Sequence, residues 1–136
     1  MTRTGGCQCG SLRYELSGDP VDLYVCHCLE CRHQSASAFG ISVIVRAADF
    51  TLVRGEASAW TRKATVSGSM TCYFCPTCGS RLWHGDPAVE KTLSIKGGTF
   101  DDPPDLSRAK HIWVKRKLPG VLIPDAVETY PEEPPS

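Results

Sequence analysis

Three of the eight cysteines lie so close together that one metal ion could bind all of them. They are Cys26, Cys28 and Cys31, three thiols within six residues. Zinc in proteins prefers four tetrahedral ligands, and a site with three protein ligands leaves its fourth position to water or a substrate atom. We therefore predict that this three-cysteine set holds a catalytic zinc.

Four more cysteines form two half-sites, Cys7 with Cys9 near the start of the chain and Cys75 with Cys78 beyond its midpoint. Together they supply four thiolates, and a closed four-thiolate zinc site is structural by default. This four-cysteine set would join segments that are far apart in sequence. Cys72 remains, and we expect it to be a thiol that binds no metal.

Other interpretations of these residues stay open at this point. In an oxidising compartment the cysteines would form disulfides, although CxC and CxxC pairs in a reducing compartment favour metal ligands. The three-cysteine set could recruit His27, or a residue of a neighbouring chain, as a fourth ligand and become a second structural site. The other three histidines lack ligand spacing, and we expect ordinary surface or packed positions for them: His33, His84 and His111.

Length and charge set limits on the class of protein. A chain of 136 residues with 41% hydrophobic content is expected to form one domain with its own core, over residues 1–130, followed by a frayed tail over residues 131–136. The 15 basic and 15 acidic residues cancel, so no net charge draws the chain to nucleic acid or to an anionic membrane. The sequence shows no signal peptide and no run of about 18 apolar residues. We expect a cytoplasmic protein that binds neither nucleic acid nor membrane.

Short segments with alternating or β-branched side chains recur along the chain, with turn residues between them. This pattern predicts an all-β domain. The predicted strands are residues 11–16, 22–25, 39–45, 50–53, 57–63, 70–74, 80–84, 92–96 and 111–114. Residues 29–38 favour either a helical turn or an irregular loop.

The segments around the cysteines resemble the glutathione-dependent formaldehyde-activating enzyme family, which includes centromere protein V. The resemblance covers nearly the whole chain, in matching order and spacing. The matching segments are Gly6-Cys7-Gln8-Cys9-Gly10, Cys26-His27-Cys28-Leu29-Glu30-Cys31-Arg32, Phe74-Cys75-Pro76-Thr77-Cys78-Gly79-Ser80, residues 98–103 and residues 111–114. Two features depart from the family pattern: residues 33–36 replace a lysine and a glycine of many members, and Cys72 lies outside the usual ligand set.

The resemblance implies a β-tent, two antiparallel sheets pinned by a structural zinc at the four-cysteine set. It also implies a second, catalytic zinc at Cys26, Cys28 and Cys31, so that each chain would hold two zinc ions. The implied reaction joins a small-molecule thiol such as glutathione to a small aldehyde such as formaldehyde, giving S-hydroxymethylglutathione. A thiol at the open zinc position would lose its proton because the metal stabilises thiolate. The expected enzyme is therefore a carbon-sulfur lyase.

A second function from another class is a zinc-stabilised binding module without catalysis, because β-tent domains also serve as interaction proteins. The three-cysteine set separates the two functions, since a binding module needs only the four-cysteine zinc. Three arginines could attract the carboxylates of a glutathione-like ligand: Arg32, Arg46 and Arg81. Surface solvation is the usual role of an arginine, and Arg32 stands out because it adjoins the cysteines.

Overall fold

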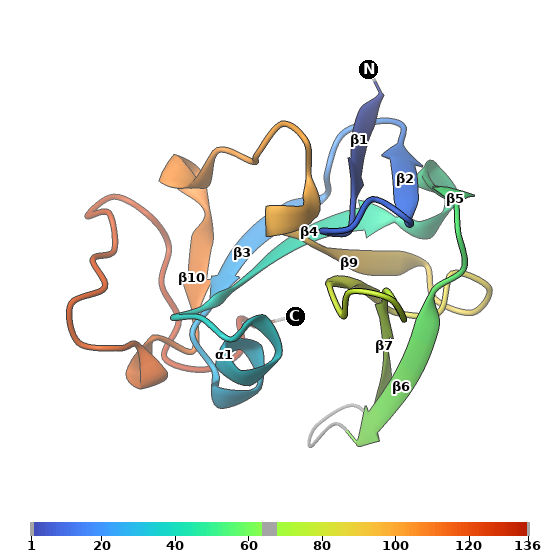
Figure 1. Cartoon of the computed structure of the whole chain (residues 1–136). Coiled ribbons are helices and arrows are strands. Elements are labelled where there is room, and N and C mark those ends of the chain that lie inside the picture. Colours follow the sequence, from blue (N-terminus) through green and yellow to red (C-terminus); the bar gives the residue numbers. More distant parts are fainter. Residues whose placement is uncertain (1, 64–67, 136) are drawn as a thin grey trace.

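The computed structural model describes residues 2–63 and 68–135, and ten strands in these ranges form two sheets (Figure 1). The small sheet has the order β1-β2-β5, and its strands are β1 (Arg3–Gly6), β2 (Arg13–Leu16) and β5 (Phe50–Arg54). The large sheet has the order β10-β3-β4-β9-β8-β7-β6. Its strands are β3 (Asp22–Cys26), β4 (Gly40–Arg46), β6 (Ser58–Lys63), β7 (Ser69–Phe74), β8 (Arg81–His84), β9 (Thr92–Lys96) and β10 (Lys110–Ile112).

Helical structure is sparse in the same described ranges. One α-helix, α1 (Leu29–Ser35), follows β3 and lies beside the start of β4 (Figure 1). Four single-turn 3₁₀-helices connect strands: η1 (Ala47–Asp49), η2 (Gly97–Thr99), η3 (Leu106–Arg108) and η4 (Val114–Arg116). Within residues 2–63 and 68–135, no helix is both long and apolar enough to cross a membrane.

The predicted fold class is confirmed, because the chain is mostly β and has two sheets. Every predicted strand overlaps an observed one, and the segment 29–38 contains α1. Among the strands that the structure describes, all pairs are antiparallel except that of β10 with β3, which is parallel and lies at the edge of the large sheet.

The strand β1 was not among the predicted strands, and its last two residues are glycines. Glycine is depleted in strands because it adds no side-chain packing. Here the backbone passes too close to β2 for any other residue. A Cβ on Gly5 would lie 2.4 Å from Oη of Tyr14, and one on Gly6 would lie 2.3 Å from the carbonyl oxygen of Leu12.

The two faces of the large sheet have different roles, because successive side chains of a strand point to opposite faces. One cross-strand row is apolar and belongs to the core shared with the small sheet: Tyr73, Trp83, Ile95, Val43 and Leu23. The neighbouring row, on the opposite face, is mostly polar: Cys72, His84, Ser94, Ile44 and Asp22. The polar face is therefore available for a site.

The C-terminal segment returns to the edge of the large sheet beside β10. The amide of Tyr130 donates to the carbonyl of His111 at 2.9 Å, and the amide of Trp113 donates to the carbonyl of Glu132 at 3.2 Å. The Trp113 indole also donates to the Glu133 carboxylate at 2.7 Å. The described part of the tail, residues 131–135, thus contacts the segment after β10, while the expected domain boundary at residue 130 and the fraying of residues 131–136 stay predictions.

Candidate active site

The four-cysteine set comes together although its two halves are far apart in sequence. The four Sγ atoms all lie within 4.8 Å of one another. Sγ of Cys9 is 3.6 Å from Sγ of Cys7 and 3.7 Å from Sγ of Cys75. Zinc–sulfur bonds of about 2.3 Å in a tetrahedron place two sulfurs about 3.8 Å apart. The donor atoms therefore fit a zinc ion.

Each half of the four-cysteine set is a tight turn closed by a glycine. The amide of Gly10 donates to the carbonyl of Cys7 at 3.1 Å, and the amide of Gly79 donates to the carbonyl of Cys75 at 2.8 Å. The two glycines have φ of 81° and 82°, a backbone conformation that other residues rarely adopt. The turns hold the sulfurs of each half on one side.

Serine hydroxyls favour the thiolate form in this set. The Ser80 hydroxyl lowers the pKa of Cys78 to about 5, and the Ser11 hydroxyl, 3.2 Å from Sγ of Cys75, lowers the pKa of Cys75 to about 7. Metals bind cysteine as thiolate, so these hydrogen bonds prepare the set to bind a metal near neutral pH.

The three-cysteine set forms where β3 passes into α1. Cys26 ends β3, Cys28 is the N-cap of α1, and Cys31 lies in its first turn. The amide of Cys31 donates to Sγ of Cys28 at 3.3 Å, which is the usual bond between an N-cap side chain and the N3 amide. All three Sγ atoms lie within 4.8 Å of one another. Local helix capping therefore explains why the CxxC spacing brings the sulfurs together.

Gly40 on β4 leaves room for this set. Cys26 pairs with Gly40 across β3 and β4. A Cβ on Gly40 would lie 3.1 Å from Cβ of Cys31 and 3.4 Å from its Sγ. A side chain at this position would press on Cys31, so the glycine lets α1 approach the sheet.

The close approach of the three thiols shifts their pKa values in opposite directions. Hydrogen bonds from the thiols of Cys26 and Cys31 lower the pKa of Cys28 strongly. Hydrogen bonding to Cys28, then to Cys31, and burial raise the pKa of Cys26. One thiolate is thus stabilised by two protonated neighbours. A bound cation would supply the positive charge that those protons now provide, so the donor set fits zinc with three protein ligands.

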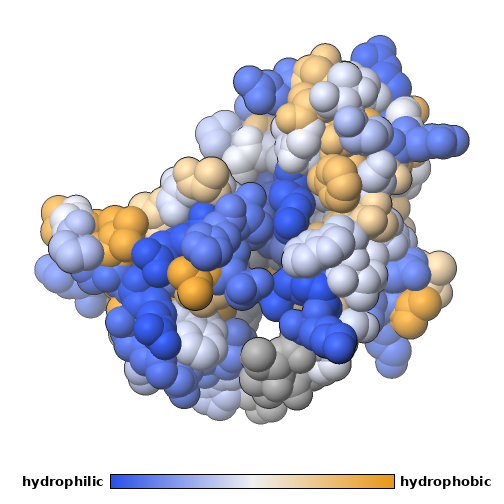
Figure 2. Space-filling model, turned by 60° about the horizontal axis from the view of Figure 1, so that its bottom comes forward, coloured by the Kyte–Doolittle hydropathy of each residue, from blue (hydrophilic) through white to orange (hydrophobic). Residues whose placement is uncertain are grey.

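A cavity of about 620 Å³ opens beside the three-cysteine set. Its floor is the polar face of the large sheet, with alternate residues of β4 and β9 and neighbouring strands pointing into it: Tyr24, Ser42, Ile44, Ser94 and Lys96. Figure 2 shows a mostly hydrophilic face that is hollowed near its middle. None of the four-cysteine set lines this cavity among the residues that the structure describes.

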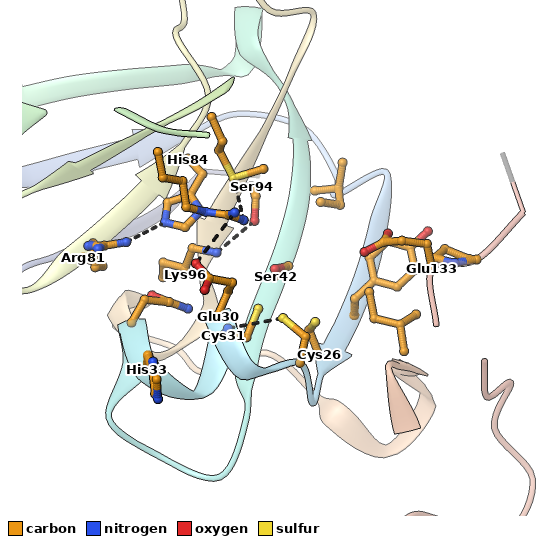
Figure 3. Close-up of a pocket in the computed structure, with 18 of the residues that line it drawn as sticks. Cys26, Glu30, Cys31, His33, Ser42, Arg81, His84, Ser94, Lys96 and Glu133 are labelled. Carbon is orange, nitrogen blue, oxygen red and sulfur yellow. Dashed lines mark hydrogen bonds and ion pairs between the residues drawn. The ribbon is translucent and has the colours of Figure 1, made fainter. Parts of the chain in front are cut away.

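Basic residues line the cavity on the side away from Cys26 (Figure 3). A guanidinium nitrogen of Arg81 lies 3.2 Å from Nε2 of His84. The guanidinium carbon of Arg81 lies over the ring of Trp60, 5.6 Å from the ring centroid. Burial, then the charges of Lys96 and Arg81, lower the pKa of His84 to about 2. The imidazole is therefore neutral, and Lys96 and Arg81 carry the positive charge of this wall.

The three arginines predicted as candidates have different surroundings. Arg81 lines the cavity, but Arg32, the one favoured by its adjacency, does not. Arg46 forms an ion pair of 2.9 Å with Asp49. Lys96 was not a candidate from the sequence, and His84 was expected to be an ordinary surface or packed histidine. The signal that could have found Lys96 is the polar alternation along β9.

His27 does not point into the three-cysteine set. Its Nε2 lies 2.9 Å from Nδ1 of His111, in a buried pair of stacked rings. Burial, then the charges of His111 and Lys117, lower the pKa of His27 to about 4. His33 and the buried His84 both line the cavity, and no histidine belongs to either cysteine set among the described residues.

Replacing Cys72 by alanine is expected to leave the metal content unchanged. Cys72 is fully buried on β7 and belongs to neither cysteine set. Loss of its small side chain should lower the free energy of unfolding by about 1 kcal/mol. Elemental analysis and a thermal melt of Cys72→Ala test this, and a variant with less bound metal would make Cys72 a ligand.

The structure is a two-sheet β protein with two cysteine sets that could each hold a metal ion, and one of these sets lines a cavity. The chain belongs to the family described as glutathione-dependent formaldehyde-activating enzyme, whose model matches residues 2–116. Among solved structures, a Rhodobacter sphaeroides protein determined as a structural genomics target is similar in fold, with a TM-score of 0.60 and 23% identity. The alignment covers 79% of this chain and 98% of that one. No curated protein matches the chain.

Proposed function

We propose that this protein is a zinc-dependent carbon-sulfur lyase acting on the adduct of a thiol and a small aldehyde. The family supports a function related to glutathione and formaldehyde. The observation that carries the proposal is the cavity lined by Cys26, Cys28 and Cys31, which lies apart from the four-cysteine set. Such a set beside a cavity can receive a ligand as well as a metal.

In the proposed reaction, the sulfur of the thiol attacks the aldehyde carbon, and a new carbon-sulfur bond forms. The carbonyl π bond breaks, and its oxygen takes up the proton that the thiol loses, so RSH and CH₂O give RSCH₂OH. The reverse reaction breaks the same bond. Zinc bound to three thiolates would lower the pKa of a thiol at its open position. Glutathione and formaldehyde are the proposed pair of substrates.

The residues of the chain contribute position and charge. Cys26, Cys28 and Cys31 are the proposed catalytic metal ligands, and α1 and β3 fix their sulfurs. Lys96 and Arg81 line the same cavity as these cysteines, which suits an anionic sulfur. Cys7, Cys9, Cys75 and Cys78 are proposed to hold the structural zinc. All these cysteines are free thiols, which suits a reducing compartment such as the cytoplasm.

A binding module without catalysis is the second candidate function. Such a module would need the four-cysteine set to stabilise its fold, and it would not need the three-cysteine set. The volume of the cavity beside the three-cysteine set, about 620 Å³, favours the enzyme because it leaves room for a small-molecule substrate.

Glutathione is expected to bind through its sulfur, and S-methylglutathione much more weakly. The methylated sulfur cannot become a thiolate, which is the form that a zinc site prefers. With cobalt replacing zinc, glutathione should change the sulfur-to-metal charge-transfer band, whereas S-methylglutathione should not. An assay for loss of free thiol on addition of formaldehyde measures the reaction in parallel.

Two results would count against the proposal. An unchanged cobalt spectrum at saturating glutathione, with no loss of free thiol, excludes glutathione as the substrate. If no other small thiol changes the spectrum either, the binding module becomes the better explanation.

A further inference from the structure

Lys96 is a buried basic residue that lines the cavity beside the three-cysteine set. The residue is only 8% exposed, and its Nζ donates to the Ser94 hydroxyl at 3.3 Å. No carboxylate among residues 2–63 and 68–135 forms an ion pair with it. A buried charge without an opposite partner is costly. A ligand that carries negative charge would remove that cost.

Two further donors line the same cavity, from Gln34 and Arg81. Nε2 of Gln34 is buried and has no hydrogen-bond partner among the described residues. A Cβ on Gly40 would lie 3.0 Å from this nitrogen and 3.4 Å from Sγ of Cys31, so the amide and the sulfur flank one point. Arg81 forms no ion pair within the described ranges. Lys96, Gln34 and Arg81 thus offer donors next to the proposed metal ligands.

The acidic residues that line the cavity are engaged by other groups. The Glu30 carboxylate lies 3.7 Å from the Arg62 guanidinium, and Glu133 accepts from the Trp113 indole at 2.7 Å. Figure 3 shows Lys96 between Ser94 and Glu30, with Glu133 at the opposite side of the cavity. The charge of Lys96 is therefore not neutralised by an acidic side chain of the cavity.

The three donors also stand where two cavities adjoin. Lys96, Gln34 and Arg81 line both the cavity of the three-cysteine set and a second cavity of about 460 Å³. The second cavity continues along η2, where a Cβ on Gly98 would meet no atom within 4 Å. A ligand longer than an aldehyde thus has space on both sides of the donors.

We propose that Lys96, Gln34 and Arg81 form an anion subsite that binds a carboxylate of the thiol substrate. This inference rests on the proposed function, because it places the sulfur of that substrate at the three-cysteine set. A carboxylate has two oxygens, which can accept from the Lys96 ammonium and from the Gln34 amide at the same time. Charge-assisted hydrogen bonds in a site screened from water are strong. The subsite would thus select thiols that carry a carboxylate.

Burial lowers the pKa of Lys96 below its ordinary value, and the neighbouring cysteines Cys31, Cys72 and Cys26 oppose this effect only in part. These thiols suggest a rival role, in which Lys96 only balances the charge of the cysteines. The two roles differ in what they predict for a neutral thiol. A charge-balancing lysine would matter equally for neutral and anionic thiols, and its loss would lower metal content.

The test compares 3-mercaptopropionate with 3-mercaptopropan-1-ol, which share a thiol and chain length but differ in charge. Binding to the zinc-loaded protein is measured by calorimetry, and metal content by elemental analysis. The wild-type protein should prefer the carboxylate. Lys96→Met should weaken 3-mercaptopropionate binding by about 10- to 100-fold, the size expected for a lost buried charge-assisted hydrogen bond. Binding of the neutral thiol and the metal content should change little.

Two more variants sharpen the result. Gln34→Met should lower the preference for the carboxylate by a smaller factor, because it removes a neutral donor. Lys91→Met is the matched control, because the substitution makes the same change in net charge. Lys91 is exposed and lines neither cavity. It should bind both thiols as the wild type does.

The outcomes separate this inference from the proposed function. Equal binding of the two thiols by the wild type overturns the anion subsite but leaves thiol binding intact. Equal weakening of both thiols in Lys96→Met, with loss of metal, assigns the charge-balancing role and overturns the subsite. If neither thiol binds the wild type, the proposed thiol chemistry fails, and the subsite fails with it.

Discussion

Replacing Cys75 by serine is expected to prevent folding. In the proposed structural zinc site, Cys75 and Cys78 would join residues 75–78 to residues 7–9, because the four sulfurs lie within 4.8 Å of one another. A structural zinc supplies about 10 to 16 kcal/mol of folding free energy. The free energy of unfolding of a typical domain is only about 5 to 15 kcal/mol, so the loss of this site would remove most of that stability. Circular dichroism and size-exclusion chromatography of Cys75→Ser should show an unfolded or aggregated chain.

The control for this experiment is Cys72→Ala, which changes another buried cysteine three residues away. It should melt within a few degrees of the wild type, because about 1 kcal/mol corresponds to a small shift in melting temperature. A folded Cys75→Ser variant with a normal melt would contradict the structural role of the four-cysteine set.

Replacing Cys28 by serine is expected to leave a folded protein without activity. Serine is a preferred N-cap residue, so its hydroxyl can accept from the Cys31 amide as the Cys28 sulfur does now, and α1 keeps its cap. The variant loses one thiolate of the three-cysteine set. Removing a residue that hydrogen-bonds to a metal ligand costs about 10- to 100-fold in activity or metal affinity, so loss of a ligand itself should lower kcat/KM at least about 100-fold.

The readouts are a thermal melt, metal content and the assay for free thiol with formaldehyde. Cys28→Ser should lose the metal of one site and retain that of the other. The division between a structural and a catalytic set fails if Cys28→Ser is less stable than Cys75→Ser, or if it keeps full activity.

The sequence predicted the features that depend on short-range patterns. The CxC and CxxC spacings placed seven cysteines in two sets, and the structure groups the same cysteines. Strands such as β9 (Thr92–Lys96) matched their predicted bounds because alternation of apolar and polar residues sets the face that each side chain takes.

The features that were not predicted from the sequence depend on contacts between residues far apart in the chain. The strand β1 was not predicted because its glycines are required by the proximity of Tyr14 and Leu12, which only the folded chain reveals. The parallel pairing of β10 with β3 joins segments more than 80 residues apart, as in the pair Ile112 and Cys26. Lys96 was missed because a polar residue in an alternating strand is normally interpreted as exposed to solvent.

Successive side chains of β4 and β9 point alternately to the core and to the cavity, so neighbouring positions serve different purposes. Val43 and Ile95 preserve the packing between the sheets, while Ser42 and Ser94 face the cavity. Relatives can therefore diverge in ligand preference at the second pair of positions without altering the residues that specify the fold. A protein engineer could randomise that pair as a library, provided that the strands keep their register. A slip of one residue would exchange the two sets.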